Sequence, residues 1–99
     1  GSITATGNVT AYSDRRLKKD LEQITNALDK VKQLTGYNYT RIDSGERHTG
    51  MIAQDIEKVL PEAVINGEEF KSVAYGNMMG LIVEAIKDLS IRLDKLEVK

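Results

Sequence analysis

The sequence predicts an α+β domain dominated by helix, with small hairpins, a long C-terminal helix and a short N-terminal β stalk. Two stretches, 17–34 and 79–96, place apolar residues three and four positions apart, which is the spacing of an amphipathic helix. Between them, short alternating stretches are separated by turn residues such as Asn66–Gly67, which is typical of hairpins. At 99 residues, the chain is close to the size at which one hydrophobic core is only just self-sufficient. We therefore expect one small domain, residues 13–99, behind the end of a stalk, residues 1–12.

The first half of the chain is expected to contain a strand, a helix and a hairpin. Residues 3–12, ITATGNVTAY, have no helical period and predict a short strand with a kink at Gly7–Asn8. A helix is expected near 15–35, because apolar residues recur on one face and Gly36 is the kind of residue that ends a helix. Residues 37–50 predict a protruding hairpin, since YNYTRI alternates like a strand and DSGERHTG has the composition of an exposed turn.

The second half is expected to contain a short helix, a hairpin and a longer helix. MIAQDIEKVL predicts an amphipathic helix at 52–59, which Pro61 closes. AVINGEEFKSV predicts a small hairpin with its turn near Asn66–Gly67. From Tyr75 onward the apolar residues alternate spacings of three and four without a slip, which is the heptad pattern of a coiled coil. This heptad seam has Met79, Ile86 and Leu93 at a positions and Ile82, Leu89 and Leu96 at d positions.

The heptad seam has two interpretations. About three heptads fit a coiled coil between chains, but they also fit an amphipathic helix docked on its own domain. Charged flanking positions as far as Lys99 favour the coiled coil, and so does the limited surface that a 99-residue chain offers to such a long helix. Association would also supply buried area that a small domain lacks. Isoleucine at both kinds of seam position disfavours a dimer, so we expect a parallel homotrimer.

The composition argues against several classes of function. The formal net charge is −1, with 14 basic and 15 acidic residues, so the chain has no general attraction to nucleic acid or anionic membrane. The absence of cysteine and the single histidine exclude thiolate and multi-histidine metal sites. No apolar run approaches the roughly 18 residues that span a bilayer, and no Gly-rich phosphate loop is present. We therefore expect no metal or other cofactor, no membrane and no nucleic acid partner. Gly1–Ser2 resembles an expression tag, which predicts a piece of a longer protein.

The stretch AYSDRRLKKD, residues 11–20, can be interpreted in two ways. In the simpler one, Ser13 or Asp14 caps a helix by accepting a hydrogen bond from a first-turn amide, and the charges form a solvated face. In the other, Ser13 is a nucleophile and Lys18 is its base. A serine hydroxyl becomes reactive when a base removes its proton, and a lysine can be that base when burial or nearby positive charge holds it neutral. Lys18 lies five positions after Ser13 and could reach back over a turn, as in known Ser–Lys pairs.

Four motifs together resemble one protein family. They are SDRRLKKDLEQI, GYNYTRI, HTGMIAQDIEKVLPEAV and VAYGNMMGLIVEAIKDL. Their shared features are Ser-Asp-x-x-x-Lys, Thr/His-x-Gly-x-Ile-Ala-Gln, Leu-Pro-Glu-x-Val, and Tyr-x-x-Met before a heptad helix. Over residues 13 to about 96, the chain is similar to the endosialidase-type intramolecular chaperone domain at the C-termini of phage tailspikes, tail fibres and neck appendages. Related domains occur in myelin regulatory factor proteins.

The resemblance implies a homotrimer that helps three copies of an upstream fibre segment of the same chain to align and fold. It places this event in the host cell cytoplasm during phage assembly. It also implies that the domain cuts itself once, between Tyr12 and Ser13, and is released from the mature virion fibre. The catalytic serine and lysine of the family fall on Ser13 and Lys18. In the corresponding chemistry, Ser13 attacks the Tyr12 carbonyl, Lys18 takes the hydroxyl proton, and water resolves the ester.

Three further residues are candidates for supporting roles. Asp14 is either an ordinary acidic residue of a first helical turn or a group that orients Lys18. His48 lies in a polar loop, where a lone histidine is usually just exposed, but the family motif makes it a supporting candidate, together with Gln54. Gly50 is expected to serve the backbone geometry of the turn.

Two rival functions remain. The first is a trimerisation module that has lost cleavage, against which the presence of both Ser13 and Lys18 argues. The second is a coiled-coil regulator that binds DNA through RRLKK, against which the balanced charge and the lack of a recognition-helix signature argue.

Overall fold

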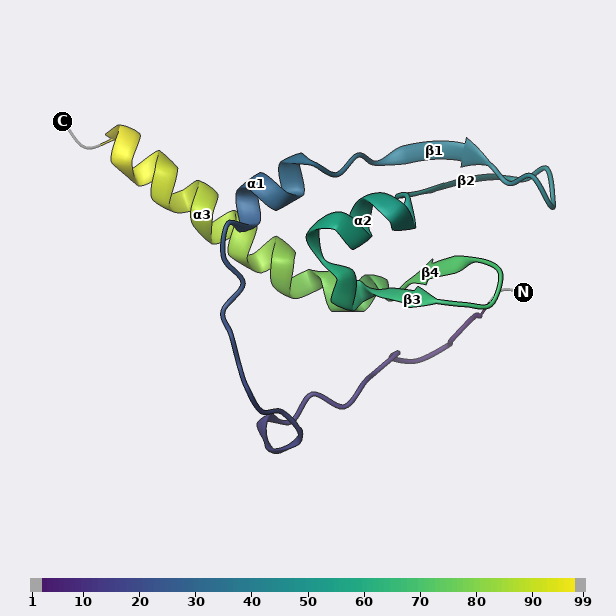
Figure 1. Cartoon of the computed structure of the whole chain (residues 1–99), viewed down its shortest axis with the longest axis horizontal. Helices are drawn as coiled ribbons and strands as arrows, with labels where there is room; N and C mark the ends of the chain where they lie inside the picture. The colour runs from purple at the N-terminus through teal and green to yellow at the C-terminus, as the bar shows by residue number, and fades with distance from the viewer. Residues whose placement is uncertain (1–2, 98–99) are drawn as a thin grey trace.

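One long helix organises the fold in the computed structural model, which describes residues 3–97. The other elements gather toward the N-terminal end of this helix, α3 (Met79–Glu97), and its C-terminal end projects beyond them (Figure 1). In chain order they are the 3₁₀ turn η1 (Arg15–Leu17), α1 (Ala27–Lys32), β1 (Tyr37–Thr40), β2 (Arg47–Gly50), α2 (Ala53–Val59), η2 (Pro61–Ala63), β3 (Val64–Asn66), β4 (Lys71–Val73) and η3 (Tyr75–Met78). The α+β class with a long C-terminal helix is therefore confirmed.

The core lies where α1, α2 and η2 meet the start of α3. Ile56 of α2 and Leu81 of α3 are completely buried, and burial of a large aliphatic side chain contributes about 1.5–3 kcal/mol to folding. Pro61 follows the end of α2 and opens η2, because proline lacks the amide hydrogen of a helix interior but fits a first turn. The buried apolar set is Ala27, Ile56, Val59, Leu60, Ala63, Val64, Met78, Leu81 and Ala85.

Two antiparallel hairpins extend from this core (Figure 1). In the first, β1 pairs with β2 from Tyr37 opposite Gly50 to Thr40 opposite Arg47. In the second, β3 pairs with β4 over three residues. Every strand residue of the first hairpin except the half-buried Gly50 is exposed, so this hairpin protrudes from the domain. Both expected hairpins and the short helix expected at 52–59 are confirmed.

Gly50 permits a close approach between two elements. It is the last residue of β2, so it does not serve the turn as the sequence had suggested. A Cβ added to Gly50 would lie 3.1 Å from the Tyr75 hydroxyl, which itself accepts a hydrogen bond from the Met51 amide at 3.3 Å. Glycine therefore lets Tyr75 reach the backbone where the first hairpin enters α2.

The helix expected near 15–35 is wrong over most of its length. Only η1 and α1 are helical there, and residues 18–26 between them are irregular. Asp20 and Asn26 have positive φ angles of 54° and 57°, a left-handed conformation that Asp and Asn tolerate and that interrupts a helix. Leu17 and Leu21, which began the apolar period, are exposed, so no packing holds a helix at this position.

The strand expected over 3–12 is not formed in the single chain. These residues are exposed, pair with no strand and bend at Thr6–Gly7, one position before the expected kink. A lone strand leaves its backbone amides and carbonyls without partners, so periodicity alone cannot stabilise it.

Helix α3 presents two apolar faces, and only one packs on the domain. Leu81 and Ala85 are buried, and α1 lies against this helix. In the heptad seam, Ile82 is half-buried, and the other five residues are between 47% and 77% exposed. The docked-helix interpretation therefore accounts for Leu81 and Ala85, while most of the seam has no partner within the described chain.

Candidate functional site

Ser13 and Lys18 meet across the single turn of η1. The Leu17 amide donates to the Asp14 carbonyl, and the Lys18 amide donates to the Arg15 carbonyl, each at 3.0 Å. This tight turn brings the Lys18 side chain back toward the start of the motif, where its Nζ donates a hydrogen bond to Ser13 Oγ at 2.6 Å. The serine hydroxyl and the lysine amine are therefore in direct contact.

Asp14 shapes the turn. Its carboxylate accepts a hydrogen bond from the Arg16 amide at 2.8 Å and two from the Arg16 guanidinium at 3.1 and 2.9 Å. The guanidinium, and after it the amide, hold the pKa of Asp14 below its ordinary value. Of the two capping candidates, Asp14 caps the turn and Ser13 is left in contact with Lys18. The Asp14 carboxylate therefore contacts Arg16 and not Lys18. It can influence Lys18 only through the conformation of the turn.

The site is open to solvent in the single chain. Tyr12 is 96% exposed, and Ser13 and Lys18 are exposed as well. The dark purple and blue segment that contains them loops away from the helices and hairpins (Figure 1). One chain thus supplies a contact between a hydroxyl and an amine, but not the walls that would exclude water from a reaction.

His48 and Gln54 lie on other elements. His48 is on β2, where its Nε2 is 3.4 Å from Glu46 Oε2 and its ring stacks on Tyr39 with centroids 6.2 Å apart. Gln54 is an exposed residue in the first turn of α2. Among the described residues, no hydrogen bond joins either of them to Ser13 or Lys18.

Two contacts that the sequence did not reveal anchor the chain leaving the site onto α3. Gln23 Nε2 donates to Glu84 Oε1 at 2.7 Å, and the Leu28 amide donates to Asp88 Oδ2 at 3.3 Å. Asp88 thereby serves the start of α1, where Asn26 provides no side-chain cap. The partners are 61 and 60 positions apart, so no local pattern in the sequence could have shown them.

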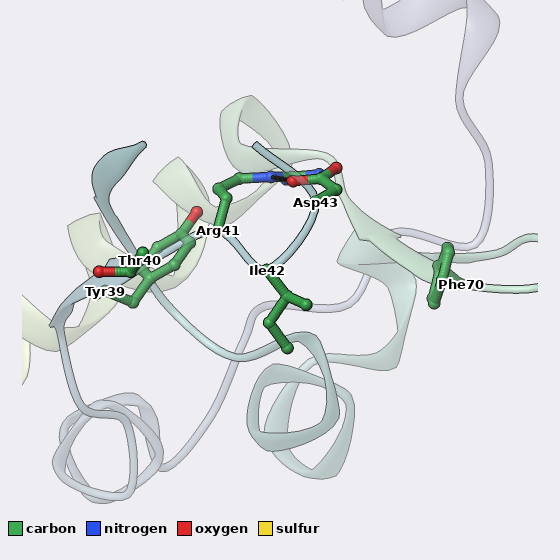
Figure 2. A pocket seen from close by; sticks show the side chains of 6 residues that line it. All are labelled: Tyr39, Thr40, Arg41, Ile42, Asp43 and Phe70. Carbon is green, nitrogen blue, oxygen red and sulfur yellow. Dashed lines mark hydrogen bonds and ion pairs between the residues drawn. The ribbon is translucent and has the colours of Figure 1, made fainter. Parts of the chain in front are cut away.

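A hollow of about 550 Å³ lies between the tips of the two hairpins. Arg41 donates to Asp43 at 2.9 and 2.6 Å across the first tip, and this pairing lowers the pKa of Asp43 to about 2. Between them, Ile42 is fully exposed, and Phe70 of the second hairpin is 77% exposed. The lining residues are Tyr39, Thr40, Arg41, Ile42, Asp43 and Phe70 (Figure 2).

Metal and membrane binding were searched for over residues 3–97. In that range, no group of three or more His, Cys, Asp or Glu side chains is arranged to hold a metal ion. The helices described there are all too short or too polar to cross a bilayer.

Comparison with known proteins identifies a family and several relatives. The Peptidase S74 family model, described as chaperone of endosialidase, matches residues 13–65 and begins at Ser13. Long tail fiber protein Gp37 of Enterobacteria phage K3 is 40% identical over 93% of this chain, and that of Enterobacteria phage M1 is 34% identical over 98%. Myelin gene regulatory factor-like A of Dictyostelium discoideum is 30% identical over 100% of this chain.

These relatives are longer proteins. The chain spans 8% of the K3 protein, 45% of the M1 protein and 13% of the Dictyostelium protein. The family match covers more than half of the chain, from the Ser-Asp-x-x-x-Lys motif to the second hairpin. This chain therefore belongs to the chaperone of endosialidase family.

Proposed function

We propose that residues 13–99 are the intramolecular chaperone of a phage tail fibre, and that this domain cuts itself from the fibre between Tyr12 and Ser13. The observation that carries the proposal is the 2.6 Å contact between Lys18 Nζ and Ser13 Oγ, directly after Tyr12. Two facts support it: the family match begins at Ser13, and several relatives are long tail fiber proteins. Residues 1–12 are then the end of the upstream fibre, and cleavage follows assembly in the host cytoplasm.

The cleavage chemistry follows from the neighbouring groups. Lys18, in its neutral form, takes the proton of the Ser13 hydroxyl while Oγ attacks the carbonyl carbon of Tyr12. The bond between this carbon and the Ser13 nitrogen breaks, the proton passes to the leaving amine, and an ester joins Tyr12 to Ser13 Oγ. Water then hydrolyses the ester, which leaves a carboxylate on Tyr12 and restores the serine hydroxyl. Each chain reacts once.

The exposed heptad seam supports a homotrimer as the active form. Five residues of the seam expose apolar side chains to solvent in the single chain. A helix rarely keeps such an apolar face exposed unless another helix covers that face. A parallel three-helix coiled coil would bury this face while Leu81 and Ala85 continue to hold α3 on its own domain. The same assembly would bring three copies of the 1–12 segment together at one place.

The hairpin tips offer a surface for the chaperone role. Ile42 and Phe70 are exposed apolar residues on either side of the hollow, and the Arg41–Asp43 pair stiffens the tip that carries Ile42. Exposed apolar residues on a protruding hairpin can bind a partly folded segment of the upstream fibre.

The test uses the full-length fibre protein. Ser13→Ala removes the hydroxyl that accepts the hydrogen bond from Lys18 and should abolish release of the domain. Because Asp14 caps the turn, this change should leave folding and trimer formation as they are, so that the trimers consist of uncut chains. Release is followed on denaturing gels and trimer mass by light scattering. Cleavage of Ser13→Ala at the unmutated rate would contradict the proposal.

The two rivals make different predictions. A trimerisation module without cleavage gives trimers of uncut chains, whether or not Ser13 is present. A DNA-binding regulator shifts the mobility of DNA in a salt-dependent way, although Arg16, part of the basic run, is already paired with Asp14.

A further inference from the structure

The segment that carries Ser13 and Lys18 continues into a stretch without secondary structure. Residues 19–26 form neither helix nor strand, and Asp20 has a positive φ of 54°. A stretch of this kind has no internal hydrogen-bond ladder to fix its course. The position of the site relative to α3 therefore depends on the side-chain contacts that the stretch makes, and these fall at Gln23 and Ile24.

The contact of Gln23 is with a restrained carboxylate. Its Nε2 donates to Glu84 Oε1 at 2.7 Å, and Lys87 Nζ holds the same carboxylate at 3.2 and 3.1 Å from the next turn of α3. Only 17% of the Glu84 side chain is exposed. The Gln23 amide, and after it Lys87, hold the pKa of Glu84 below its ordinary value. Glu84 is thus a fixed acceptor, and Gln23 is bound to one place on the helix.

The neighbouring Ile24 reinforces this attachment. It is half-buried and packs against the edge of the core, and its Cδ1 lies 3.6 Å from where a Cβ on Gly80 would be. Gln23 and Ile24 therefore hold the stretch to the first two turns of α3. The attachment point is five residues after Lys18.

Glu84 lies on the face of α3 opposite the heptad seam, because it occupies the f position of the heptad in which Met79 is a and Ile82 is d. A coiled coil along the seam would therefore leave the contact between Gln23 and Glu84 uncovered and intact. Assembly that fixes α3 would, through this contact, also restrain the chain that leads to Lys18. We infer that the Gln23–Glu84 pair is a clasp that positions the Ser13–Lys18 site when three helices assemble. The clasp rests on the proposed self-cleavage, and its two members are positioning residues that do not touch the reacting atoms.

The clasp is tested by cleavage rates in assembled trimers of the full-length fibre protein. Gln23→Ala should slow cleavage by about tenfold, because a misplacement of about 1 Å can cost up to a hundredfold. Gln23→Glu should slow it further, because it sets a second carboxylate against Glu84. The double change Gln23→Glu with Glu84→Gln restores the hydrogen bond with donor and acceptor exchanged. The double variant should recover most of the cleavage rate lost in Gln23→Glu. No recovery is expected if the single changes slow cleavage only by making the fold less stable.

Arg92→Ala is the matched control. Arg92 lies 3.5 Å from Asp29 and also joins α1 to α3, but Asp29 is 11 residues after Lys18 in the chain, against five for Gln23. This variant should cleave at the unmutated rate even where its melting temperature falls. The clasp is wrong if trimers of Gln23→Ala and Gln23→Glu cleave at the unmutated rate, or if the exchanged pair is no faster than Gln23→Glu. If unmutated trimers do not cleave, the proposed function fails, and the clasp fails with it.

Discussion

At the scale of residues, the side chains of Ser13 and Lys18 make no hydrogen bond or ion pair within residues 3–97 except the one to each other. Asp14 caps η1, and Arg16 balances its charge, so the turn would persist without the serine hydroxyl. The sequence could predict the contact between Ser13 and Lys18, because both residues belong to one short motif and a single turn separates them. It could not predict the contact of Gln23 with Glu84, since the two residues are 61 positions apart and no local spacing relates them.

Replacement of Lys18 distinguishes a base from a partner that supplies only charge. We expect Lys18→Ala to slow cleavage strongly, because Lys18 is the group that contacts the Ser13 hydroxyl among residues 3–97 and would no longer take its proton. Lys18→Arg should be equally slow, since a guanidinium keeps the positive charge but stays protonated at any working pH. The measurement is a gel time course of domain release. If Lys18→Arg cleaves at the unmutated rate, Lys18 is not the base, and His48 becomes the next candidate.

Glu84 should report the clasp through its titration. Its pKa lies below the ordinary value of 4.5, so its contribution to stability is complete above 4.5 and is lost as the pH falls through the lowered value. Gln23→Ala removes the largest cause, so the pKa of Glu84 should rise toward 4.5 while Lys87 still lowers it. Carboxyl NMR titration of both proteins measures this change. Equal midpoints would show that the amide does not bind the carboxylate in solution.

At the scale of elements, local sequence patterns predict α2 and the two hairpins correctly but predict the helix near 15–35 wrongly. The helix α2 was predicted because its amphipathic run is followed by Pro61, and the hairpins because alternation and turn residues coincide. The helix expected near 15–35 is wrong because leucine spacing stabilises an amphipathic helix only where a surface exists for the leucines to pack on. Asp20 and Asn26 interrupt the segment with left-handed backbone, and two of its leucines remain in solvent.

The two faces of α3 should respond differently to substitution. Leu81→Ala leaves a cavity at a completely buried position and should cost about 2–5 kcal/mol of folding free energy. Ile86→Asp changes a residue that is 61% exposed in the single chain, so the fold should survive while trimers are lost. Thermal melts followed by circular dichroism test the first change, and light scattering tests the second. Intact trimers of Ile86→Asp would rule out the seam as the interface.

At the scale of the whole molecule, three features of the single chain lack partners. Residues 3–12 pair with no strand in the described chain, most of the heptad seam is exposed, and the side chains of Ser13 and Lys18 are open to solvent. The proposed assembly of three chains would supply all of these partners at once, because it would bury the seam, gather the stalk segments and surround the site. The heptad pattern predicts the residues of the interface, but the surfaces that would cover the stalk and the site belong to the other two chains and leave no pattern in one sequence.

The most direct test of the central claim is the intact mass of the full-length fibre protein after it has formed trimers. We expect two fragments whose masses place the cut between Tyr12 and Ser13, so that the smaller one begins with Ser13 and carries the domain. N-terminal sequencing of that fragment identifies the bond independently. Trimers that contain only uncut chains, or a cut at any other bond, would contradict self-cleavage at Ser13.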